Sequence, residues 1–178
     1  MRKPRNPAVF RVICGLPVLF AAACSGGHAP PAPPPAGGPE LRTHAAHTPL
    51  ECGEGSGQTA TAEIGEQGGT VAVRGHALAV PANAVSTRTP FTLTEERGPY
   101  VRVEVGPHGT RFGRNATLTL SYARCPGNPG AVRQLTILEV RSGTVDVIRA
   151  LPSVVDSVAR TVSTPALDHL SGYLIGGN

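Results

Sequence analysis

The chain is poor in aromatic residues and almost free of lysine. Tryptophan is absent and aromatic residues make up 4% of the 178 positions, so the sequence predicts a core of valine, leucine, isoleucine and alanine. No lysine follows Lys3, which excludes lysine-based catalysis from the rest of the chain. The apolar runs are also shorter than the roughly 20 residues that a membrane-spanning helix needs. We therefore expect no permanent transmembrane helix.

An excess of positive charge is lacking once residues 1–23 are set aside. The formal net charge of the chain is +4, but four of its sixteen lysines and arginines lie at positions 2, 3, 5 and 11. The twelve remaining arginines are matched by twelve acidic residues and are spread among them. Nucleic-acid-binding surfaces usually show clustered positive charge, so the sequence predicts no nucleic-acid partner.

Residues 1–24 have the pattern of a secretion signal. Basic residues precede an apolar run over 12–23, and small residues at 21–23 directly precede Cys24. This order is typical of a signal peptide and its cleavage site. A cysteine at that point resembles the lipobox of bacterial lipoproteins. The resemblance implies a signal peptide over 1–23, a lipidated Cys24 and a membrane partner reached through that lipid. The alternative is an ordinary secretion signal with a coincidental cysteine.

Residues 24–62 contain few large apolar side chains. Prolines are concentrated at 29–35, and the rest is mainly glycine, alanine, threonine and histidine. Consecutive prolines favour the extended polyproline II conformation, and so little apolar surface does not offset the entropy lost on ordering. We predict a disordered, proline-rich tether over 24–62. The alternative is that the proline-rich segment is a ligand for a partner protein. Separately, Ser25 directly after Cys24 is compatible with sorting of the lipoprotein to the outer membrane of a diderm bacterium.

Four cysteines are present, and their fates are predicted to differ. Cys14 lies in the signal peptide and Cys24 is assigned to the lipid. Cys52 and Cys125 remain as an even pair in an exported chain, where oxidising conditions favour disulfide bonds. The sequence therefore predicts a disulfide between Cys52 and Cys125. Neither cysteine has the short paired spacing of a zinc site.

Residues 63–178 show the two-residue alternation of β-strands. Apolar residues alternate with polar ones in short segments separated by turn residues about every ten positions. The expected strands are 70–73, 76–80, 91–95, 101–105, 117–122, 135–140, 145–148, 159–163 and 172–175. Turns at Arg74–Gly75 and Ser142–Gly143 predict two hairpins. The fold class is all-β, a single β-sandwich of eight or nine short strands over 63–178.

Several short motifs in this segment occur in a recognisable order. They are Gly-Gly-Thr at 68–70, Ala-Val-Pro-Ala-Asn-Ala-Val at 79–85, Gly-Pro-His-Gly-Thr at 106–110, Ala-Thr-Leu-Thr-Leu at 116–120 and His-Leu-Ser-Gly-Tyr at 169–173. In this order the chain resembles the ZU-five domain, a β-sandwich of netrin receptors, ankyrins and tight-junction scaffolds. The resemblance implies a protein-interaction or structural module and no enzyme activity.

The catalytic alternative is self-cleavage of the chain, in which His169 and Ser171 would be the reacting residues. In some ZU-five and related domains a His-apolar-Ser tripeptide cleaves itself, and carried over by position this makes Ser171 the nucleophile and His169 the base. That reaction needs a strained Leu170–Ser171 peptide bond. The competing interpretation is structural, with both side chains holding the last strand by hydrogen bonds.

No cofactor and no fixed metal site are predicted. His44 and His47 have a ligand-like spacing only if that segment is helical, and they are expected to bind metal at most opportunistically. Glu95, Glu96 and Glu104 are expected to be solvated. We predict a lipid-anchored cell-envelope protein with a protein or envelope partner, which binds at loop 106–115 or loop 126–133.

Overall fold

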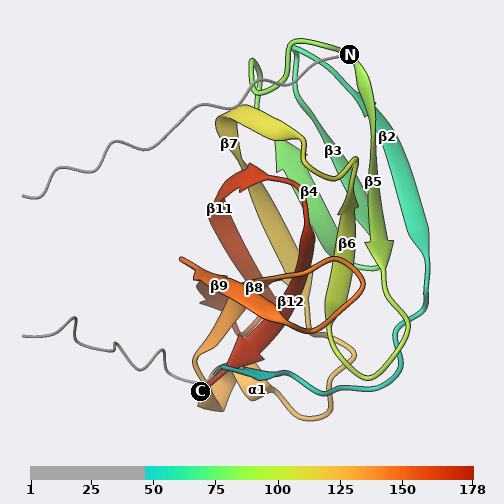
Figure 1. Ribbon diagram of the computed structural model, residues 1–178. Helices are drawn as coiled ribbons and strands as arrows, with labels where there is room; N and C mark the ends of the chain where they lie inside the picture. The colour runs from blue at the N-terminus through green and yellow to red at the C-terminus, as the bar shows by residue number, and fades with distance from the viewer. Residues whose placement is uncertain (1–46) are drawn as a thin grey trace, which may run out of the picture. The chain divides into compact units, whose positions relative to one another are not determined.

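A computed structural model describes residues 47–178 of the chain. These residues form two antiparallel β-sheets packed face to face, as Figure 1 shows. The predicted all-β sandwich is therefore confirmed. Cys24, His44 and the rest of residues 1–46 lie outside the described residues.

The larger sheet contains seven strands, in the order β2-β5-β6-β12-β8-β9, with β1 paired to β12. Their bounds are β1 Thr48–Pro49, β2 Thr59–Ile64, β5 Thr89–Glu95, β6 Arg102–Gly106, β8 Leu135–Val140, β9 Val147–Leu151 and β12 Gly172–Gly177. Every pairing in this sheet is antiparallel. The last strand of the chain thus lies between β6 and β8, in the middle of the sheet.

The smaller sheet contains five strands, in the order β10-β11-β7-β4-β3. Their bounds are β3 Gly69–Val73, β4 His76–Val80, β7 Arg111–Ser121, β10 Val154–Asp156 and β11 Thr161–His169. One four-residue helix, α1, covers Pro129–Val132 between β7 and β8. Within residues 47–178, no helix has the length and apolar character needed to cross a membrane.

The core lies between the sheets and is mainly aliphatic, as the composition predicted. Leu78 and Leu118 from the smaller sheet are fully buried, as are Leu93, Val103 and Ile137 from the larger one. Alternation along each strand places every second side chain in this layer. Leu138, Val140 and Leu174 form a separate buried cluster.

Both predicted hairpins are present. Arg74 and Gly75, between β3 and β4, have φ values of 52° and 86°, as expected for a two-residue turn that matches the twist of its strands. The second hairpin joins β8 and β9 through Gly143, which also has a positive φ. Its return strand is Val147–Leu151 and not 145–148.

The fold begins earlier than residue 63. Residues of the segment assigned to the tether form β1, which pairs with β12, and most of β2, which pairs with β5. β2 shows little apolar periodicity because its half-buried positions, Ala60 and Ala62, carry small side chains. A sheet-edge strand with so little apolar volume resembles a polar linker in composition.

Candidate functional site

The predicted disulfide is present. Cys52, in the segment between β1 and β2, is bonded to Cys125, which follows β7. The backbone N–H of Cys52 also donates to the carbonyl oxygen of Pro99 at 2.6 Å. The disulfide attaches the segment that precedes β2 to the loop that follows β7.

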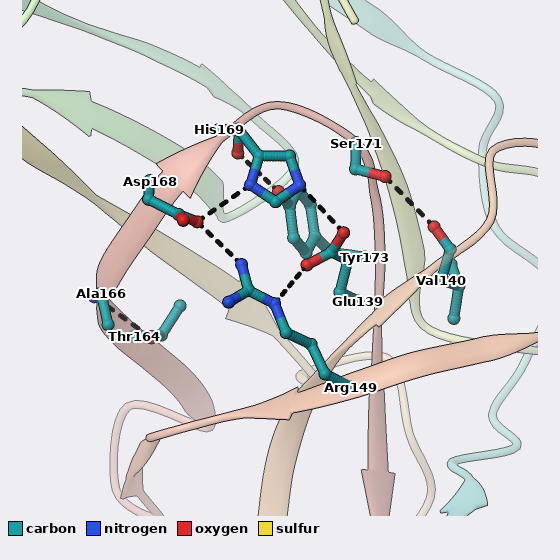
Figure 2. A network of polar contacts seen from close by, with 9 residues as sticks. All are labelled: Glu139, Val140, Arg149, Thr164, Ala166, Asp168, His169, Ser171 and Tyr173. Carbon is teal, nitrogen blue, oxygen red and sulfur yellow. Dashed lines mark hydrogen bonds and ion pairs between the residues drawn. The ribbon is translucent and has the colours of Figure 1, made fainter. Parts of the chain in front are cut away.

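His169 is held between two carboxylates at the crossing from β11 to β12. Its Nε2 lies 2.9 Å from Oε1 of Glu139 on β8, and its Nδ1 lies 2.9 Å from Oδ1 of Asp168. Figure 2 shows the imidazole between these groups. Because β11 and β8 belong to different sheets, the contact to Glu139 links the two layers. Both ring nitrogens are engaged by carboxylates.

Arg149, on β9, completes this polar network. Its Nε donates to Glu139 at 2.6 Å and its Nη2 donates to Asp168 at 2.7 Å. These hydrogen bonds raise the pKa of Arg149. The hydrogen bond from Arg149 is also the main reason that the pKa of Asp168 falls to about 2. The hydroxyl of Tyr173 donates to the carbonyl oxygen of His169 at 2.6 Å, and burial raises its pKa.

Ser171 faces a different partner. Its hydroxyl donates to the carbonyl oxygen of Val140, on β8, at 3.2 Å, and Figure 2 shows the side chain directed away from His169. No hydrogen bond joins His169 and Ser171 among the described residues. The two residues named as a nucleophile and its base are therefore close in sequence but not aligned for proton transfer.

The backbone N–H and carbonyl groups of Leu170 are both hydrogen-bonded. Its N–H donates to the carbonyl of Thr110, and its carbonyl accepts from the N–H of Gly109. Within residues 47–178, positive φ outside glycine occurs at Arg74, Asn83 and Arg160, all away from this loop. The structural interpretation of the tripeptide requires hydrogen bonds from both side chains to neighbouring strands, and these are present.

A second polar cluster, for which the sequence carries no local signal, joins the sheets near the disulfide. Glu95, at the end of β5, was expected to be solvated, but it is 3% exposed. Its Oε2 accepts from the backbone N–H and the hydroxyl of Ser56. Its Oε1 lies 3.3 Å from Nε of Arg124 and 3.6 Å from Nε2 of His76. The expectation of a solvated Glu95 was wrong because these groups come from distant parts of the chain.

Burial and hydrogen bonding fix the charge states in this cluster. Burial lowers the pKa of His76, despite the opposing effect of Glu95. The N–H of Ser121 donates to Nδ1 of His76 at 3.1 Å, so the neutral ring carries its proton on Nε2. Burial acts to raise the pKa of Glu95, but the hydrogen bonds from Ser56 together with His76 outweigh it and leave the pKa lowered. The cluster therefore holds a neutral histidine beside a carboxylate.

Metal ligands are not gathered in this part of the chain. Among residues 47–178 no group of three or more histidine, cysteine, aspartate or glutamate side chains has an arrangement suited to a metal ion. The chemistry of the His76 ring agrees, because its Nε2 carries a proton and offers no lone pair to a metal.

No protein-family model matches the sequence, and no curated protein matches it.

Proposed function

We propose that the chain is a lipid-anchored cell-envelope protein whose β-sandwich is a non-catalytic binding or structural module. The observation that carries the proposal is the order of basic residues, an apolar run, small residues and Cys24. The disulfide between Cys52 and Cys125 supports export, because such bonds persist in oxidising compartments. Sorting to the outer membrane is proposed for a diderm source.

The motif order over 68–173 supports a ZU-five-like domain, whose known relatives act through protein contacts. A two-sheet antiparallel sandwich is compatible with this proposal. A surface hollow of about 460 Å³ favours the region 106–115 as the binding region, since Thr110, Arg111 and Gly113 line the hollow together with loop residues such as Ser86 and Thr87. The expectation of a loop over all of 106–115 was wrong in part, because β7 already begins at Arg111 and only 107–110 form a loop. The proposed partner is a protein or another envelope component.

Self-cleavage at Leu170–Ser171 is the competing function. It requires the imidazole of His169 to leave Glu139 and Asp168, and the hydroxyl of Ser171 to turn away from Val140. The network that holds these groups supports the non-catalytic role, so we treat cleavage as an outcome to be tested.

Lipid labelling tests the anchor. Cells that express the chain are grown with a radiolabelled fatty acid, and the recovered protein is examined for label. We expect label on the wild-type chain, loss of label in Cys24→Ser, and full label in the matched control Cys14→Ser, because Cys14 leaves with the signal peptide. Equal labelling of Cys24→Ser and wild type would contradict the proposed anchor.

A further inference from the structure

A small pocket with an excess of positive charge opens beside the second cluster. It has a volume of about 320 Å³, near the lower end of the range for small-molecule sites, about 300 Å³. Its lining comes from the β3–β4 turn, β4, the end of β5 and the end of β7: Arg74, His76, Glu95, Ser121, Ala123 and Arg124. Because His76 is neutral, two guanidinium charges against one carboxylate leave a formal net charge of +1.

Arg124 keeps hydrogen-bond donors that no described residue satisfies. Its Nη2 donates to the carbonyl oxygen of Tyr100 at 2.5 Å. Its Nε and Nη1 are buried and make no hydrogen bond within residues 47–178, although Nε lies 3.3 Å from Oε1 of Glu95 in an ion pair. Buried donors without an acceptor are uncommon in folded proteins, so this guanidinium still has the capacity to bind one.

The carboxylates of the protein compensate the two arginines only in part. Burial lowers the pKa of Arg124, despite the opposing effects of Glu95 and of Glu54, which lies outside the pocket lining. Arg74 is exposed at the β3–β4 turn and forms no ion pair within residues 47–178. Positive charge is therefore left over on two sides of the pocket.

The uncharged side chains of the lining add further donors. His76 carries its proton on Nε2, because its Nδ1 accepts from the N–H of Ser121. This Nε2 lies 3.6 Å from Oε1 of Glu95, beyond the usual length of an N–H···O hydrogen bond, about 3 Å. The hydroxyl oxygen of Ser121 accepts from the N–H of Ala123, which leaves the hydroxyl hydrogen free to donate. An excess of donors and of positive charge favours an anionic ligand.

Glu95 limits the charge of that anion. A single negative charge neutralises the net charge of the lining, whereas a second would face the Glu95 carboxylate without a matching cation. A carboxylate is a planar monoanion whose oxygens fit the fork of a guanidinium. A phosphate group, with about two negative charges at neutral pH, fits less well.

We propose that this pocket binds the carboxylate group of a small acid or of a peptide chain end. Arg74 and Arg124 donate to the carboxylate oxygens, and His76 and Ser121 add hydrogen bonds. Because Nη1 of Arg124 is buried, this contact requires a small movement of its side chain. Every contact involves described residues of the sandwich, so the site does not depend on lipid at Cys24.

An NMR titration tests this site. The full chain is labelled with ¹⁵N in micelles of a non-ionic detergent at neutral pH, and acetate or N-acetylglycine is added. We expect the amide signals of Gly75, Ser121 and Ala123 to shift, with a Kd on the order of 1–10 mM. Acetamide, which has the shape of acetate without its charge, should leave them in place. Equal shifts with acetamide, or no shift with either carboxylate, would overturn the proposal.

Further probes separate the sources of the carboxylate and the competing anions. Of the two carboxylates, tighter binding of N-acetylglycine supports a peptide chain end as the ligand, and tighter binding of acetate supports a small acid. Chloride producing the same shifts at the same concentration would indicate a response to any anion. Inorganic phosphate binding more tightly than both carboxylates would indicate a dianion site. Either of these last two results would overturn the proposal.

Two variants with opposite expected effects sharpen the titration. Arg74→Asn removes an exposed guanidinium at a positive φ that asparagine tolerates, and it should raise the Kd for acetate about tenfold. Glu95→Gln removes the opposing negative charge and should lower the Kd severalfold. The matched control Arg88→Asn alters an exposed arginine just before the opposite end of β5 and should leave the Kd unchanged. An unchanged Kd in Arg74→Asn would overturn the proposal, whether or not Glu95→Gln folds.

Discussion

Glu139 links the two sheets through its charge. Its side chain is 5% exposed on β8, and its two oxygens contact Arg149 from the same sheet and His169 from the other. A buried charge is tolerated when it is paired, whereas removal of one partner from a buried ion pair typically costs about 3–5 kcal/mol. The stability of the β11–β12 crossing therefore depends on this carboxylate.

Replacing Glu139 tests this dependence. Glu139→Ala leaves His169 without its inter-sheet partner and leaves Arg149 with Asp168 alone. We expect the free energy of unfolding to fall by about 1.5–3 kcal/mol, the contribution of hydrogen bonds to a charged group, measured by urea denaturation. The matched control is Glu63→Ala, which removes an exposed pair with Arg88 and should cost less than about 1 kcal/mol. Equal losses in the two variants would contradict the assigned role.

Acid should reduce stability in two ranges. The pKa of His76 is lowered by burial, so the unfolded chain binds this proton more tightly and acidification below about pH 6.5 favours unfolding. The pKa of Asp168 is about 2 in the fold, so its contribution is complete above about pH 4 and is lost as the pH approaches 2. Thermal unfolding followed by circular dichroism from pH 7.5 to 2.5 measures both losses.

Two substitutions test which residue causes the loss of stability in each pH range. His76→Gln should flatten the Tm profile between about pH 6.5 and 5. Asp168→Asn should reduce the slope below about pH 4, where Glu95, whose pKa is also lowered, contributes the rest. A Tm profile that is unchanged in both variants would show that other groups control the response to acid.

The burial of Glu95 and Glu139 could be predicted from local alternation, whereas their ion-pair partners could not. Alternation from Phe91 through Leu93 places Glu95 on the inner face, and the same rule from Ile137 places Glu139 there. The sequence therefore contained a signal for both burials. It contained none for their partners, because His76, Arg124 and His169 approach through pairings between distant strands.

At the scale of elements, strands with strong alternation were predicted well and weak ones were not. The β3–β4 hairpin follows from its turn residues and from apolar alternation on both sides. The edge strands β2 and β10 were missed, and so was the two-residue β1. Small alanines in β2 and the shortness of β10 leave almost no periodic signal, while β1 is defined only by its pairing with β12.

The Cys52–Cys125 bond is expected to stabilise the early elements strongly. It joins residues that are 73 positions apart, and closing a loop of that size in the unfolded chain corresponds to about 4 kcal/mol in the chain-entropy treatment. The double variant Cys52→Ser, Cys125→Ser should lose about this much in urea denaturation. Addition of a reductant to the wild type should give the same loss, and a loss below about 1 kcal/mol would contradict the expectation.

At the scale of the whole molecule, the sequence predicted two packed sheets but not their strand order. Periodicity determines which side of a strand is buried, while the neighbours of each strand depend on long-range pairing. Placement of β12 between β6 and β8 brings Tyr173 beside the His169 network and Ser171 beside Val140. The arrangement of the candidate site thus follows from topology that local patterns do not encode.

The intact mass of the protein, recovered from its native membrane under denaturing conditions, tests the proposed lipid anchor and the non-catalytic role most directly. We predict a single species that begins at an acylated Cys24 and retains residues 171–178. Loss of the mass of residues 171–178, abolished by Ser171→Ala, would show a self-cleaving domain and contradict the non-catalytic role. A chain without acylation at Cys24 would contradict the proposed anchor.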